Sequence, residues 1–318
     1  TIWEKELADH LISWRGIIIF WAVVLSAVFA IYGGSGAIQN IRGDVANPTQ
    51  FGVDFVFLRL FTTSGEGTPS FLYFVSTFLL PILGITLGFD VINRERNGGT
   101  LSRLLSQPIY RDNVFNGKFF AGMSVIAIAM GSIILLVSGL GLRLIGVSPS
   151  SGESFRLLLF FGTSMLYGAF WLGMAMLFSI LLSRIAASAL ATIAIWIFFI
   201  FFSIMVGSLI ADTMVPIDQT STNEEILRNI GLQITASRAS PITIFGEATT
   251  VILAPGARTA SEMLQIQTAS GARWMPGQLS IGESLLTIWP HLLTLFAISA
   301  AFFAASYIKL MREEIRST

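Results

Sequence analysis

Residues 92–118, INRERNGGTLSRLLSQPIYRDNVFNGK, form a basic segment between two long apolar stretches. Asn97–Gly99 is expected to end a helix, because glycine readily takes the left-handed conformation found just beyond helix ends. A short helix is predicted over Thr100–Ser106, and Pro108 ends it. Its apolar residues lie at positions i, i+3 and i+4, which share one face: Leu101, Leu104 and Leu105. The segment therefore predicts a short amphipathic helix on the cytoplasmic side. Its leucine face needs a partner protein or a lipid surface to cover it.

The composition around this segment excludes a water-soluble protein. The chain has 318 residues, of which 53% are hydrophobic and 12% charged, whereas a soluble domain carries about 25% charged residues. Nineteen basic residues balance 19 acidic ones, so no overall field attracts nucleic acid. With no cysteine and only 2 histidines, disulfides, thiolate metal sites and cysteine nucleophiles are excluded, and a histidine-rich metal site is not expected.

Long apolar stretches predict an all-α membrane protein with a single transmembrane domain over residues 1–318. A helix needs about 20 apolar residues to cross the hydrocarbon core. Six stretches qualify: Gly16–Tyr32, Phe71–Val91, Phe120–Leu144, Leu157–Leu182, Ile185–Ala211 and Leu285–Ile308. Residues 92–119 are then a cytoplasmic loop. Residues 212–284 form an extracytoplasmic cap, in which Ser240-Pro241 begins a helix.

The first 15 residues predict a helix that lies along the membrane surface. Apolar residues recur there at helical spacing, namely Trp3, Leu7, Leu11 and Trp14. Indole rings favour the membrane–water interface. The segment lacks a small-residue cleavage pattern, so a cleavable signal peptide is not expected.

Basic residues predict the orientation. One set of connections carries many of them within short segments: Lys5, Arg15, Arg94, Arg96, Arg103, Arg111, Lys118, Arg184, Lys309, Arg312 and Arg316. The opposite set carries them thinly over longer loops. Because positive charge is enriched on the cytoplasmic side, we expect a multi-pass protein of the cell (cytoplasmic) membrane with both termini in the cytoplasm.

Small residues at four-residue spacing indicate where the spans pack closely. They are Gly84 with Gly88, Ala127 with Gly131, Ala169 with Gly173, Ala187 with Ala191, and Ala297, Ala301 and Ala305. Each pattern fits packing within the chain or an interface with a second subunit, for which the second and sixth spans are the candidates. The sequence leaves both open.

The loop also resembles the permeases of the ABC exporter type-2 family. In that family an acidic residue, then G-T-L-x-x-L-L-S-x-P-x-x-R, then G-K, occupies the loop between the second and third spans. The matching residues here are Glu95, Gly99-Thr100-Leu101, Leu104-Leu105-Ser106, Pro108, Arg111 and Gly117-Lys118. The resemblance extends to the six-span plan. Ser240–Leu253, SPITIFGEATTVIL, is similar to the corresponding segment of archaeal and bacterial members, among them permeases that serve nitrous oxide reductase maturation.

The resemblance implies that Thr100–Ser106 is a coupling helix that docks in a groove of a cytoplasmic ATPase subunit. The implied coupling residues are Glu95, Gly99, Thr100, Leu101, Arg103, Leu104, Leu105, Pro108 and Arg111. A second ATPase contact would use Trp3, Glu4 and Leu7. The implied partners are two ATPase subunits, a second copy of this permease or a related one, the lipid bilayer, and, where the work is mechanical, an extracytoplasmic protein. A competing interpretation of the short helix is that it rests on lipid headgroups.

The chain lacks the motifs of an enzyme. No phosphate-binding G-x-x-x-x-G-K-[ST] sequence exists, because Asp112 stands where the first glycine of such a motif ending at Lys118 would be, and Phe119 follows. We therefore expect no catalytic, cofactor-binding or metal residue here, with ATP and Mg bound by the partner ATPase. The substrate is expected to be hydrophobic or amphipathic.

The alternative function is a secondary transporter or channel without an ATPase. The membrane core lacks the charged residues that ion-coupled carriers need, and no repeat relates the first and last three spans. Among the polar residues, Asp90 and Glu95 are expected to pair with Arg94 and Arg96. His291 fits either hydrogen-bonded packing or a substrate contact.

Overall fold

The computed structural model describes residues 2–33, 55, 57–62, 71–99, 111–146, 148–218, 221–255 and 279–312. Over these ranges the chain is helical and contains no β-strand. Five helical segments are long and apolar enough to cross a membrane: Phe71–Asn97, Arg111–Arg143, Ser151–Leu181, Ile185–Met214 and Ile281–Arg312. A sixth results if the bent pair Ile2–Ile12 and Gly16–Val28 is counted as one span. The predicted all-helical, multi-span class is confirmed at this level, whereas the helix predicted over Thr100–Ser106 lies outside the described residues.

The first two helices meet at a sharp bend. α1 (Ile2–Ile12) and α2 (Trp14–Gly33) are separated by Ser13, and the pair is bent by 65°. A Cβ at Gly16 would collide with the carbonyl oxygen of Leu11. The bend therefore requires glycine at this position.

The next apolar segment contains a π-helical turn. α5 (Phe71–Phe74), η1 (Val75–Leu79) and α6 (Leu80–Gly88) follow one another directly. Pro81 has no N–H to donate to the carbonyl of Thr77 four residues earlier, and the N–H of Leu80 donates to Val75 instead of Ser76. Other helices satisfy the two released carbonyl oxygens. Trp196 Nε1 donates to Thr77 O at 2.8 Å, and the Tyr167 hydroxyl donates to Ser76 O at 2.8 Å.

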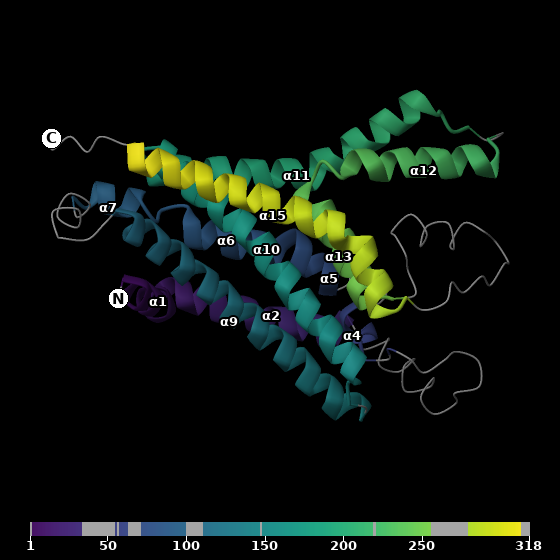
Figure 1. Ribbon diagram of the computed structural model, residues 1–318, viewed down its shortest axis with the longest axis horizontal. Coiled ribbons are helices and arrows are strands. Elements are labelled where there is room, and N and C mark those ends of the chain that lie inside the picture. Colours follow the sequence, from purple (N-terminus) through teal and green to yellow (C-terminus); the bar gives the residue numbers. More distant parts are fainter. Residues whose placement is uncertain are drawn as a thin grey trace.

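α10 (Ser151–Leu181) is the central helix of the bundle. It packs against α6, α9 (Arg111–Ile145), α13 (Pro241–Leu253) and α15 (Ile281–Arg312) (Figure 1). Its N-terminus has a capping box in which Ser150 and Glu153 bond each other's backbone N–H groups. Its aromatic side chains Tyr167, Phe170 and Trp171 are buried in the core.

The predicted small-residue pattern of the second span packs within the chain. A Cβ on Gly84 would lie 2.5 Å from Trp171 Cβ, and one on Gly88 would lie 2.6 Å from Ala175 Cβ. Gly173 of α10 in turn faces Phe302 of α15. Of the two interpretations left open, intramolecular packing therefore accounts for these glycines.

We expect Gly84→Ala to destabilise the fold by about 1–3 kcal/mol, the usual cost of overpacking a tight core. The new methyl group would meet Trp171 Cβ and the backbone nitrogen of Leu172, at 2.5 and 2.9 Å, and backbone cannot move aside cheaply. Thermal unfolding of the detergent-solubilised protein measures the effect. Gly139→Ala is the control, because a Cβ at Gly139 meets nothing within 4 Å; an equal loss in both variants would contradict the argument.

The region between the last two long helices is itself helical. α11 (Ile185–Met214) packs mainly against α12 (Asn223–Ser237), and α13 follows. Figure 1 shows α11 and α12 as a hairpin that extends beyond the bundle. α13 begins at Pro241, whose missing N–H suits the first helical turn. Only 7% of the apolar stretch of α11 is buried within the chain.

Candidate functional site

A polar pocket of about 390 Å³ lies where α1, the end of the second apolar segment and the start of α9 meet. It is located at the base of residues 100–110, because the described chain stops at Gly99 and resumes at Arg111. Figure 1 places α1, α7 (Asn93–Asn97) and the C-terminal end of α15 at the same end of the bundle. The pocket is lined by Lys5, Glu6, Asp9, His10, Ser13, Asp90, Val91, Arg94, Glu95, Gly98 and Lys118.

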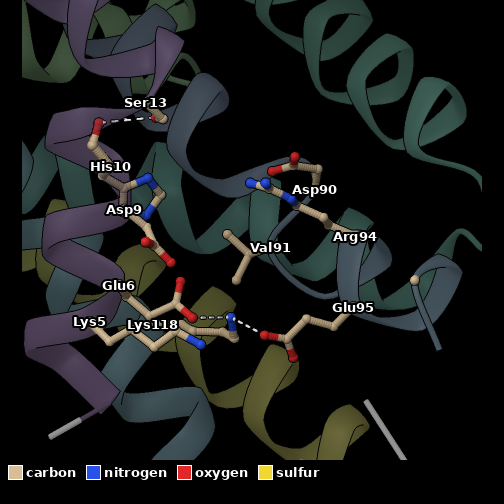
Figure 2. Close-up of a pocket in the computed structure, with 11 residues that line it drawn as sticks. Lys5, Glu6, Asp9, His10, Ser13, Asp90, Val91, Arg94, Glu95 and Lys118 are labelled. Atoms are coloured by element: carbon tan, nitrogen blue, oxygen red, sulfur yellow. Dashed lines mark hydrogen bonds and ion pairs between the residues drawn. The ribbon is translucent and has the colours of Figure 1, made fainter. Parts of the chain in front are cut away.

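Lys118 joins three helices at the centre of this pocket. Its Nζ lies 2.7 Å from Glu6 Oε1 of α1 and 2.7 Å from Glu95 Oε1 of α7 (Figure 2). The lysine side chain is 4% exposed, against 19% for Glu6 and 15% for Glu95. A charge this buried is tolerated only when opposite charges compensate it. The three side chains are hereafter called the Lys118 cluster.

The sequence did not reveal this cluster. Glu95 forms an ion pair with Lys118, a partner that the sequence did not indicate; its expected pairing with Arg94 and Arg96 stays a prediction. The third span was expected to begin at Phe120, whereas α9 begins at Arg111. Lys118 therefore lies about two turns inside a helix rather than in a loop. The family's G-K motif, Gly117-Lys118, was the one feature of the sequence that drew attention to Lys118.

α1 packs closely along the start of α9. A Cβ on Gly117 would lie 2.9 Å from Ile2 Cγ2, so glycine permits the two helices to approach. Trp3 Nε1 donates to Ser124 Oγ at 3.0 Å. Of the residues predicted as a second ATPase contact, Trp3 is 39% exposed, Glu4 is exposed, and Leu7 packs partly against the core.

The turn that leads into α7 is attached to α10. Ser179 Oγ accepts hydrogen bonds from the N–H groups of Ile92, at 3.1 Å, and Asn93, at 3.2 Å. N–H groups at the start of a helix have no partner within it, so one buried hydroxyl satisfies two of them. No motif in the sequence distinguishes Ser179 from the other polar residues of α10.

Few of the predicted coupling residues are described. Gly99 follows α7 with φ +64°, a conformation that favours glycine. Arg111 is half-buried and starts α9. The others, Thr100, Leu101, Arg103, Leu104, Leu105 and Pro108, lie outside the described residues.

A second polar cluster joins α12, α13 and α15. Glu247 Oε2 accepts from Arg238 Nε at 2.9 Å and lies 2.9 Å from His291 Nε2. The Glu247 side chain is 6% exposed. His291 therefore has the hydrogen bond expected of a packing role.

Arg156 anchors the ends of two other helices to α10. The guanidinium, which is buried, donates to Ile252 O at the end of α13 at 3.0 Å and to Leu279 O at 2.6 Å. It also donates to Ser284 Oγ in the first turn of α15 at 3.0 Å. The sequence gives no sign of these contacts, because the acceptors of Arg156 lie at least 96 residues away.

The polar side chains of the base pocket hold neighbouring helices together. The Lys118 cluster is charge-paired and binds three helices to one another. Among the described residues no group of three or more His, Cys, Asp or Glu side chains is placed to hold a metal ion.

The described fold is that of a helical, multi-span membrane protein, and comparison with known proteins identifies its family. The chain belongs to the ABC-2 family of transporter proteins, whose family model matches residues 1–315. Membership implies a multi-pass membrane protein, in agreement with the long apolar helices.

Two relatives are similar over much of the chain. "Probable ABC transporter permease protein NosY" of Pseudomonas aeruginosa is 29% identical over 203 residues, 63% of this chain and 66% of the relative. The protein of the same name from Stutzerimonas stutzeri is 27% identical over 231 residues, 71% of this chain and 74% of the relative. The match thus spans just under two thirds of the first relative's length.

Proposed function

We propose that this chain is the transmembrane permease subunit of an ABC exporter. ATP, with Mg, would be hydrolysed by a separate cytoplasmic ATPase, and the permease would export a hydrophobic or amphipathic substrate or exert mechanical work on an extracytoplasmic partner. Two ATPase subunits would act on two permeases, the second being another copy of this chain or a related one.

The Lys118 cluster is the observation that carries this proposal. It binds α7, which leads into residues 100–110, to α9, which leads out of them, and to α1. Ser179 attaches the same turn to α10. A push on the loop would move these helices together as one body, as rigid-body switching requires.

The proposed orientation of the chain in the membrane is set by placing the base of residues 100–110 on the cytoplasmic side. With the Lys118 cluster in the cytoplasm, α1 would lie along the inner membrane surface and the chain would cross six times, so that both termini are cytoplasmic. The 65° bend between α1 and the following helix supports this arrangement. Trp3, Glu4 and Leu7 would then be near a docked ATPase.

The substrate pathway would lie between two permeases. α11 buries only 7% of its apolar stretch within its own chain, so it has a long face available for a partner or a pathway. The second and fifth spans would line the cavity by analogy with the family, and an apolar lining supports a hydrophobic or amphipathic substrate.

Co-purification tests the proposal. The permease, co-expressed with its candidate ATPase and extracted in mild detergent, is expected to bring the ATPase down in equimolar amount and to stimulate its hydrolysis. The contrary result is a permease that purifies alone and transports in vesicles with an ion gradient and no ATP. That outcome would favour the secondary transporter.

A further inference from the structure

The α11–α12 hairpin is held together by its own contacts. A Cβ on Gly207 of α11 would lie 2.9 Å from the carbonyl oxygen of Gln233 of α12, so the two helices approach closely there. Nearer the turn between them, Asn229 of α12 donates to Asp212 Oδ1 at 3.0 Å and to Val215 O at 2.7 Å. Two helices that are joined at both levels are expected to move as one body.

The hairpin is attached to the rest of the bundle more loosely. Only 7% of the apolar stretch of α11 is buried within the chain, and the hairpin extends beyond the bundle (Figure 1). Aromatic rings meet edge-on between the two bodies: Phe78 with Trp196 at 6.0 Å between centroids, and Trp171 with Phe199 at 6.3 Å. A pocket of about 260 Å³ lies beside these contacts, between η1, α11, α12 and α13. The hairpin therefore has space to shift against the bundle.

One directional contact fixes where the hairpin rests. Trp196 Nε1 donates at 2.8 Å to Thr77 O in η1, one of the two carbonyl oxygens that the π-helical turn and Pro81 release. Tyr167 of α10 donates to the other, Ser76 O, at 2.8 Å. Backbone groups inside a bilayer have no water as an alternative partner. The turn thus carries one bond to the bundle and one to the hairpin.

We propose that the Trp196–Thr77 hydrogen bond is a latch that holds the α11–α12 hairpin against the bundle, and that the π-helical turn is the joint at which the hairpin moves away. The second apolar segment continues from this turn to α7 and Glu95. Displacement of the Lys118 cluster therefore reaches the latch along one segment, and breaking the bond releases the hairpin. The inference goes beyond the proposed function and rests on it only for the source of the displacement.

Distances between two spin labels measure the position of the hairpin. The chain has no cysteine, so Arg228→Cys on α12 and Ser151→Cys at the start of α10 place the labels, both at exposed positions. The labelled chain is diluted with unlabelled chain in nanodiscs, so that only distances within one chain are recorded. Trp196→Phe keeps an aromatic ring and loses the donor. We expect the released population to grow about twofold to tenfold, the worth of one hydrogen bond.

Two substitutions are matched controls for the loss of the indole. Tyr167→Phe removes the other hydrogen bond to the π-helical turn, which lies within the bundle. Trp289→Phe replaces an indole on α15 that is 56% exposed. Both variants should keep the wild-type distance distribution. A wild-type distribution in Trp196→Phe, or an equal shift in Tyr167→Phe, overturns the proposal.

Pro81→Ala tests the latch from the acceptor side and leaves Trp196 in place. Alanine supplies the N–H that proline lacks, and in an ordinary helix this group donates to the carbonyl four residues earlier, which is Thr77 O. It therefore competes with the indole, and the released population should grow as it does in Trp196→Phe. An unchanged distribution in Pro81→Ala overturns the proposal even where Trp196→Phe does not fold.

The link to the base is tested by adding the ATPase, with ATP and vanadate, to the labelled wild-type permease. The released population should grow when the complex is trapped, and a trapped complex with an unmoved hairpin overturns the proposal. A permease that recruits no ATPase would refute the proposed function. The shift in Trp196→Phe, which is measured without the ATPase, would still establish the latch.

Discussion

Leu104→Asp combined with Leu105→Asp is expected to abolish association with the ATPase while leaving the membrane bundle folded. Both leucines belong to the predicted apolar face of Thr100–Ser106. Placing carboxylates there would leave unpaired charge in a groove built for apolar side chains, which is strongly unfavourable. Losing two central anchors of an interface costs roughly 4 kcal/mol, or about a thousandfold in affinity. Co-purification and permease-stimulated ATP hydrolysis measure the loss.

The control for this variant is Ser102→Asp with Ser106→Asp. It adds the same charge to the opposite side of the predicted helix and should assemble normally. If the leucine variant assembles and hydrolyses ATP as the wild type does, the docking role is wrong. If both variants fail alike, charge rather than the leucine face is responsible.

Lys118→Met should both destabilise the base and uncouple it. Without the ammonium group, Glu6 and Glu95 are two partly buried carboxylates with their shared cation removed. Removing one partner of a buried ion pair typically costs about 3–5 kcal/mol. We therefore expect a lower unfolding temperature and a loss of permease-stimulated ATP hydrolysis. Lys309→Met, which removes an exposed lysine at the end of α15, is the control.

A compensated variant separates stability from coupling. Lys118→Met together with Glu6→Gln and Glu95→Gln removes all three charges and should recover most of the lost stability. If the Lys118 cluster transmits motion, hydrolysis remains uncoupled in this variant. Full recovery of coupling would show that the cluster is only structural, and an unchanged unfolding temperature in Lys118→Met would contradict its burial.

The sequence predicted that Gly84 and Gly88 lie at a close helix–helix contact, but it did not identify the partner helix. Gly84 and Gly88 were recognisable as a close-packing pair, because any helix that approaches another through small residues uses this spacing. Whether the partner helix was in the same chain or a second one depended on where α10 lies. The structure places Trp171 and Ala175 against them.

The hydrogen bonds of several buried polar residues could not be predicted from the sequence at all. Arg156 and Ser179 bond backbone groups that lie at least 86 residues away in the sequence, and no motif near either residue names these partners. Trp196 likewise donates to a carbonyl released 119 residues earlier. Such contacts form between helices that are distant in sequence, so no periodic pattern records them.

By itself, the sequence determined that this protein is a helical, multi-span membrane protein, and it singled out residues 92–118 as the segment that carries the family motif. Hydrophobic length and helical periodicity are local properties, and they decide which segments enter a bilayer. Only the tertiary structure decided that Lys118 joins α1 and α7, and that Glu247 contacts both Arg238 and His291. Both depend on how helices stack, which is set by packing between segments far apart in the chain.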